Sequence, residues 1–273
     1  MPPRPFQRTS SSPFRIPAVL LAAGLMAVAG ACRDRAPEKG RAPSVTLTVS
    51  AAASLREAVA ELDSLYGAEH PEVAVRANFG ASGALRQQIE QGAPVDVFIS
   101  ASESHADALQ RAGLIDPRTR RVLAGNELVL VVPAGSPSAA TDFRSLASPA
   151  VKRVAIGAAA SVPAGEYADE VLRSLGIADA VGKKAVYGQN VRQVLAYVES
   201  GNVDAGIVYR TDAAVSRRAR VSATAPAGTH RPITYPLAVI QSSAHRGEAT
   251  AYAAFLLGPR GRDVLARHGF TSP

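Results

Sequence analysis

Apolar and polar residues alternate at the start of the patterned part of the chain. Val45, Leu47 and Val49 alternate with Thr and Ser, which is the period of a strand. The small residues 51–53 then allow a tight turn, and Ser54 stands at the expected N-cap of a helix whose apolar positions run from Leu55 to residue 65. We therefore predict a strand that leads directly into a Ser-capped helix.

The same alternation of strand and helix patterns continues along the chain. We predict strands over 73–79, 95–100, 127–133, 154–157, 185–187, 205–209 and 235–240. We predict helices over 84–91, 103–112, 167–175 and 191–200, and a final helical stretch over 249–268 that is broken near Gly258 and Pro259. Such alternation predicts an α/β fold with mostly parallel sheets flanked by helices.

Three of the predicted junctions into helices share a composition suited to an anion. Ser54 precedes one helix, Ser82 and Gly83 precede a second, and Asn190 and Val191 begin a third. The carboxyl ends of parallel strands are where open α/β sheets bind ligands, and helix N-termini offer free N–H donors there. A lone Ser before a helix is more often a plain N-cap. The recurrence favours a shared site in which neutral donors hold a dianion.

The N-terminal residues predict export rather than a part of the fold. Residues 1–31 combine basic residues, an apolar segment and a small-residue cleavage site, as a signal peptide does. Cys32, the single cysteine, follows at once and is a candidate for lipidation; plain cleavage after Ala31 is the alternative. Residues 32–44 are charged and unpatterned, which predicts a flexible tether.

The length and net charge of the chain limit which kinds of protein it can be. With 273 residues and 47% hydrophobic content, the chain can form two lobes with full cores. The net charge of +7 includes one basic run at 217–220, which lacks interleaved aromatic residues. We interpret that run as a solvated face, so we expect no nucleic-acid partner. The mild positive charge would still steer a small dianion toward the protein.

Short motifs along the chain resemble the periplasmic molybdate-binding proteins of ABC transporters. They occur in family order from about residue 45 to 270, and each is weak alone; they cover 51–55, 79–83, 92–101, 162–165, 190–192, 206–209, 235–239 and 269–270. The resemblance implies a two-lobed periplasmic-binding-protein fold of type II, with an oxyanion in the cleft between the lobes. We expect lobe 1 to comprise 45–126 and 226–273, and lobe 2 to comprise 127–225.

The same resemblance implies the site and its partners. It assigns the ligand to the hydroxyl and amide of Ser54 and Ser82, the N–H of Ala164 and Val191, and the hydroxyl of Tyr209. These residues would hold the metal oxyanion through hydrogen bonds, without direct metal ligation and without a cofactor. The residue pattern alone favours only Ser54, Ser82 and Val191. The expected partners are molybdate or tungstate and a membrane permease. The protein would be an extracytoplasmic monomer, attached to the membrane only through a lipid on Cys32.

Two other functions remain open from the sequence. Sulfate, like molybdate, carries no proton near neutral pH, so a donor-only site would also suit a sulfate-binding protein. Phosphate keeps a proton and needs an acceptor; Glu166 and Asp204 are the acids nearest in sequence to the expected site. An exported hydrolase with Ser54 or Ser82 as nucleophile would need a base in hydrogen-bond reach. None of the five His lies in a junction motif, so we expect a binding protein rather than an enzyme.

Overall fold

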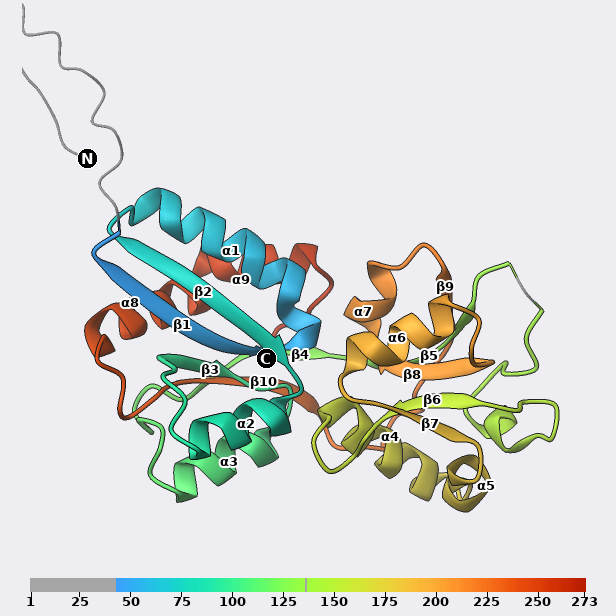
Figure 1. The fold of residues 1–273 in the computed structure, drawn as a ribbon. Helices are drawn as coiled ribbons and strands as arrows, with labels where there is room; N and C mark the ends of the chain where they lie inside the picture. The colour runs from blue at the N-terminus through green and yellow to red at the C-terminus, as the bar shows by residue number, and fades with distance from the viewer. Residues whose placement is uncertain (1–42, 136) are drawn as a thin grey trace, which may run out of the picture. The chain divides into compact units, whose positions relative to one another are not determined.

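The computed structural model describes residues 43–135 and 137–273. The expected signal peptide, Cys32 and nearly all of the expected tether lie outside these residues. The described residues belong to one compact unit, which contains two five-stranded sheets (Figure 1).

Each sheet has a single strand that runs against the other four. The first has the order β2-β1-β3-β10-β4, and β10 is antiparallel to both neighbours. The second has the order β7-β6-β8-β5-β9, and β5 is antiparallel to both neighbours. The mostly parallel sheets expected from the sequence are confirmed. The first sheet comprises β1 (Val45–Ala52), β2 (Val73–Gly80), β3 (Val97–Ile99), β4 (Arg121–Asn126) and β10 (Ile233–Val239); the second comprises β5 (Leu128–Pro133), β6 (Val154–Gly157), β7 (Ala185–Gly188), β8 (Ala205–Tyr209) and β9 (Ala219–Thr224).

Helices pack against each sheet, and each sheet with its helices is called a lobe below. The first lobe holds α1 (Arg56–Glu69), α2 (Ser82–Glu90), α3 (Glu103–Arg111), α8 (Arg246–Leu257) and α9 (Pro259–Arg267), with the 3-10 turn η1 (Ala53–Leu55) before α1. The second holds α4 (Pro163–Ser174), α5 (Ala178–Gly182), α6 (Val191–Glu199), α7 (Arg210–Ala214) and the 3-10 turn η2 (Arg144–Ala147). In Figure 1, α1 and α9 lie on one side of the first sheet, and α2 and α3 lie on the other.

The apolar faces of both lobes explain why these segments fold as they do. Leu47 and Val49 of β1 are fully buried, as their alternation with polar residues requires. The strand β5, which lies between β8 and β9, is buried along 128–132, so its continuous apolar sequence fits a strand covered on both faces. The break predicted in the C-terminal helix is also confirmed, because α8 ends at Leu257 and Pro259 begins α9.

Candidate functional site

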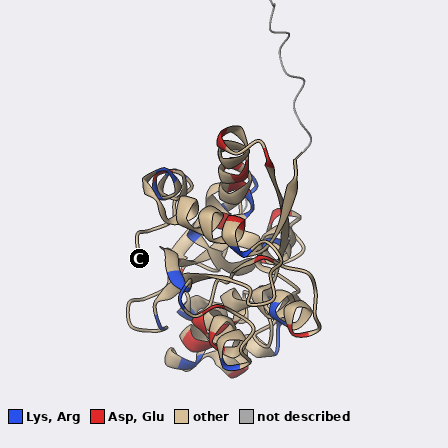
Figure 2. Ribbon diagram, turned by 90° about the vertical axis from the view of Figure 1, so that its left-hand side faces the viewer, with Lys and Arg blue, Asp and Glu red and all other residues tan. Residues whose placement is uncertain are grey.

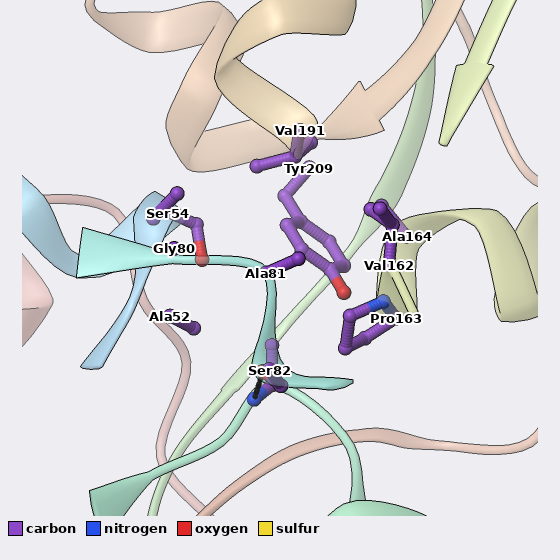
Figure 3. Close-up of a pocket in the computed structure, with 12 residues that line it drawn as sticks. Ala52, Ser54, Gly80, Ala81, Ser82, Val162, Pro163, Ala164, Val191 and Tyr209 are labelled. Atoms are coloured by element: carbon purple, nitrogen blue, oxygen red, sulfur yellow. Dashed lines mark hydrogen bonds between the residues drawn. The ribbon is translucent and has the colours of Figure 1, made fainter. Parts of the chain in front are cut away.

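A small cavity lies where the carboxyl ends of strands from both lobes meet (Figure 3). Its volume is about 10 Å³, far below the roughly 300–1,000 Å³ of clefts for organic ligands. A small ion therefore fits better than an organic molecule. The residues that line it are Ala52, Ala53, Ser54, Gly80, Ala81, Ser82, Ala101, Val162, Pro163, Ala164, Val191 and Tyr209.

The structure brings all five residues expected from the sequence to this cavity. Ser54 and Ser82 follow β1 and β2 in the first lobe, whereas Ala164, Val191 and Tyr209 follow or end β6, β7 and β8 in the second. Each of the five is at least 96% buried. None of the lining residues is charged, so any anion held here would meet only neutral groups.

Ser54 lies in the cavity but does not cap a helix, so the predicted N-cap is wrong. It falls inside η1, and Leu55 precedes the first residue of α1 without a side-chain cap. The Ser54 hydroxyl instead lies 2.9 Å from the hydroxyl of Tyr235, which is 181 residues away in the sequence. A long-range partner thus competes with the local capping bond that the sequence pattern favoured.

Asn126, which the sequence did not single out, favours one direction for the hydrogen bond between Ser54 and Tyr235. Asn126 Nδ2 donates to the Tyr235 hydroxyl oxygen at 3.1 Å and to the Thr211 hydroxyl at 2.9 Å. Tyr235, which already accepts from Asn126, can donate its own proton to Ser54 Oγ. The Ser54 proton is then free to point into the cavity. Tyr235 belongs to one of the family-like motifs, but nothing in the pattern near Asn126 indicated this contact.

Ser82 is arranged as a second hydroxyl donor. Its oxygen accepts a hydrogen bond of 3.0 Å from the N–H of Ala101, so its proton remains available. Ser82 is also the first residue of α2, which begins two residues earlier than the predicted helix. Its own N–H therefore belongs to the helix N-terminus, where the helix supplies no acceptor.

The backbone N–H donors of the second lobe lie in the first turns of α4 and α6. Pro163 begins α4 and has no N–H to offer, so Ala164 carries the first free N–H of that helix. Val191 begins α6, and the Asn190 side chain caps that helix by accepting from Gln193 N at 3.0 Å. The helix start predicted at Val191, directly after Asn190, is confirmed. Both N–H groups lie at the positive ends of helix dipoles.

The hydroxyl of Tyr209 is the clearest sign that the cavity can take a ligand. Its hydroxyl is buried and has no hydrogen-bond partner among the described residues. Burial, the largest cause, raises the pKa of Tyr209 well above its ordinary value, so the hydroxyl keeps its proton and can act as a donor. A buried hydroxyl without a partner costs about 1–3 kcal/mol, and an anion in the cavity would relieve that cost.

The acidic residues named as alternatives are engaged elsewhere. Glu166 accepts from Ser102 Oγ at 3.0 Å, and its carboxylate also contacts His105 at 2.9 Å and Arg231 at 2.6 Å. Burial raises the pKa of Glu166, but these partners outweigh that effect and lower the pKa overall. Asp204 accepts from the N–H groups of residues 152 and 153. The cavity thus lacks a carboxylate acceptor among its lining residues.

The lobes also meet through the backbone beside the cavity. The N–H of Gly83 in α2 donates to the carbonyl oxygen of Ser161 in the second lobe at 2.9 Å. A Cβ on Gly83 would lie 2.6 Å from the Ser161 Cα, so this approach requires glycine. Gly83 in the predicted Ser-Gly junction thus also allows the two lobes to approach each other, a role that the residue type alone did not indicate.

Other chemistries are not supported by the described residues. They contain no group of three or more His, Cys, Asp or Glu that could hold a metal ion. None of the described helices is long and apolar enough to cross a membrane. In the view of Figure 2, Lys and Arg occur interspersed with Asp and Glu.

Comparison with known protein families gives a match over nearly the whole described chain. The profile of the bacterial extracellular solute-binding proteins matches residues 47–271. That is a family of transport proteins and not of enzymes, so the hydrolase alternative is wrong. The hydroxyls of Ser54 and Ser82 accordingly contact Tyr235 and Ala101 rather than an imidazole.

Individual relatives are similar over most of their length. A Bacillus subtilis protein, provisionally named the ABC transporter substrate-binding lipoprotein YvgL, is 43% identical over 90% of this chain and 93% of its own. The molybdate-binding protein ModA of Escherichia coli is 37% identical over 82% of this chain and 88% of its own. The solved periplasmic molybdate-binding protein of Azotobacter vinelandii has a TM-score of 0.73 and 25% identity over 83% of this chain and 99% of its own. The expected two-lobed fold of type II is confirmed.

Proposed function

Because the chain belongs to the bacterial extracellular solute-binding proteins, we propose that the solute it binds is molybdate, with tungstate as an equivalent ligand. The protein would deliver this oxyanion to the membrane permease of an ABC importer. The names of the E. coli and A. vinelandii relatives support molybdate. The size and donor chemistry of the cavity support a small, unprotonated oxyanion independently of those names.

One observation carries the proposal. The buried hydroxyl of Tyr209, which has no hydrogen-bond partner in residues 43–135 and 137–273, faces a cavity that neutral donors from both lobes surround. Ser54 and Ser82 would donate through their hydroxyls and amides, Tyr209 through its hydroxyl, and Ala164 and Val191 through their N–H groups. A hydrogen bond to a charged group contributes about 1.5–3 kcal/mol. Five or more such bonds could offset the loss of hydration of a dianion.

The donor set also explains which anions the site would reject. Molybdate, tungstate and sulfate carry no proton near neutral pH, so they need only donors. Phosphate keeps a proton and would leave it without an acceptor, because the cavity lining includes no acidic side chain. A buried donor without an acceptor costs about 1–3 kcal/mol. Sulfate remains the alternative ligand, since only its smaller size distinguishes it from molybdate.

Two further features of the protein remain proposals. We propose that Cys32 carries a lipid anchor, which the lipoprotein name of the B. subtilis relative supports. Replacing Cys32 with Ser should then move the exported protein from the membrane fraction to the soluble fraction. We also propose that lobe 1 comprises 45–126 with 226–273 and that lobe 2 comprises 127–225. We further propose that the protein is a monomer. Gel filtration with light scattering measures its molar mass in solution and so tests whether it is a monomer.

A panel of anions tests the proposed ligand. The melting temperature of the purified protein should rise with molybdate and tungstate at concentrations well above the dissociation constant. Sulfate should raise it less, and phosphate should leave it unchanged. A larger shift with sulfate than with molybdate would favour the sulfate-binding alternative, and no shift with any oxyanion would contradict the proposal.

A further inference from the structure

A cluster of three charged side chains, Glu57, Arg192 and Asp212, joins the two lobes. Arg192, the second residue of α6, directs two guanidinium nitrogens at the carboxylate of Glu57 in α1, one of them at 3.1 Å. Its Nε lies 2.6 Å from Oδ1 of Asp212 in α7. Glu57 belongs to the first lobe, whereas Arg192 and Asp212 belong to the second. The paired contact with Glu57 is the two-pronged geometry that makes arginine–carboxylate pairs strong and directional.

Each member of this cluster lies within three residues, in the sequence, of a residue that lines the cavity. Glu57 follows Ser54 by three residues, Arg192 follows Val191 directly, and Asp212 follows Tyr209 by three residues. A change in the separation of Glu57 and Arg192 therefore also changes the separation of Ser54 and Val191. The ion pair between Glu57 and Arg192 and the size of the cavity therefore both depend on the separation of the two lobes.

Arg192 itself does not line the cavity. Its guanidinium contacts the carboxylates of Glu57 and Asp212 instead. The Asp212 side chain is fully buried, and those of Arg192 and Glu57 are 20% and 36% exposed. If the lobes separated, Asp212 would keep Arg192 as its partner inside the second lobe, whereas Glu57 would be hydrated. The contact with Glu57 is the part of the cluster that depends on closure.

We propose that Arg192 is a positioning residue that stabilises the closed arrangement of the lobes through Glu57 and thereby slows release of the bound oxyanion. The effect on release rests on the proposed function, whereas the effect on closure does not. Closure that is stabilised by contacts outside the ligand lowers the conformational cost of binding.

Glu57→Gln tests the proposal with a matched control on the same helix. Glu61, four residues further along α1, pairs with Arg267 and His268, which both belong to the first lobe. Glu61→Gln therefore removes a similar ion pair without touching the lobe contact. We expect Glu57→Gln to release molybdate about threefold to tenfold faster in stopped-flow measurements, and Glu61→Gln to match the wild type. Equal release rates for wild type and Glu57→Gln would overturn the proposal.

A ligand-independent measurement separates this proposal from the proposed function. Dyes on cysteines introduced at the exposed positions Arg76 and Tyr187, in a chain with Cys32→Ser, report the distance between the lobes. Without any anion, Glu57→Gln should shift the distance distribution toward open forms relative to Glu61→Gln. If wild type binds no oxyanion but this shift occurs, only the proposed function fails. If it binds and no shift occurs, the role of Arg192 is refuted.

A variant with changes at both Arg192 and Asp212 tests the role of Arg192 without leaving a buried charge that could destabilise the fold. Arg192→Gln alone would strand the buried Asp212 carboxylate, so it is combined with Asp212→Asn. In this double variant, adding Glu57→Gln should change neither release nor the lobe distance further. An additional effect as large as that in the wild-type background would show that Glu57 acts through another partner, which would overturn the assignment to Arg192.

Discussion

The main-chain N–H of Gly83 donates a hydrogen bond of 2.9 Å to the carbonyl oxygen of Ser161, and this bond joins the two lobes at the edge of the cavity. Gly83 directly follows Ser82, and Ser161 lies three residues before Ala164. The backbone contact thus fixes how closely one donor of the first lobe approaches one donor of the second.

Gly83→Ala should weaken ligand binding without unfolding the protein. The added Cβ would lie 2.6 Å from Ser161 Cα and 2.7 Å from its carbonyl oxygen, so the lobes could not close fully. We expect at least a tenfold loss of molybdate affinity by calorimetry, which corresponds to about 1.4 kcal/mol.

Gly67→Ala is the control for the change at Gly83. Gly67 lies in α1, and a Cβ there would meet no atom within 4 Å. This variant should raise the free energy of unfolding by about 0.4–1 kcal/mol and leave affinity unchanged. Wild-type affinity in Gly83→Ala would show that close approach at Ser161 is not needed for binding.

Removing either serine hydroxyl should cost binding energy directly. Ser54→Ala and Ser82→Ala each remove one donor to a charged ligand, so each should weaken molybdate binding by about 1.5–3 kcal/mol, or roughly tenfold or more. Tyr235→Phe should weaken binding less, because it frees Ser54 from its fixed donor direction without removing the hydroxyl. Calorimetry on the three variants measures this order, and unaltered affinity in both serine variants would refute the site.

Tyr209→Phe should change stability and affinity in opposite directions. The hydroxyl has no partner among the described residues, so its removal should raise the free energy of unfolding without ligand by about 1 kcal/mol. Molybdate affinity should fall at the same time. Tyr252→Phe is the contrasting variant, because that hydroxyl donates to Asp63 at 2.5 Å; it should lower stability and leave affinity unchanged. A destabilised Tyr209→Phe would mean that its hydroxyl has a structural partner.

The stability of the protein should fall as the pH rises from about 4 to 7. Burial raises the pKa of Asp63 from 3.8 to about 6, and it raises that of Asp212 to about 7 despite the opposing charge of Arg192. The folded chain therefore binds more protons than the unfolded chain in this window, and each group contributes a slope of at most about 1.4 kcal/mol per pH unit. Asp63→Asn should flatten the slope measured by urea unfolding between pH 4 and 6. The control is Asp263→Asn, because Asp263 is exposed and its substitution should leave the slope unchanged. The same slope in Asp63→Asn as in the wild type would contradict the assignment to Asp63.

Local sequence patterns predicted most of the elements and part of the site, but not β4, β9, α5 or α7. The alternation in β1 and the start of α6 after Asn190 each depend on neighbouring residues, so the sequence predicted them correctly. The role of Ser54 depends on Tyr235, and the role of Gly83 depends on Ser161, and neither partner is near in sequence. Tyr209 and Ala164 were expected only from the family resemblance, because an apolar strand end and a small loop residue carry no local sign of binding.

A crystal structure of the protein with molybdate, phased on the anomalous scattering of molybdenum, tests the proposed site most directly. We expect one molybdenum peak in the cavity, with oxyanion oxygens in hydrogen-bond distance of Ser54, Ser82, Ala164, Val191 and Tyr209 and with no charged side chain in contact. A molybdenum peak elsewhere, or a lysine or arginine side chain against the oxyanion, would contradict it.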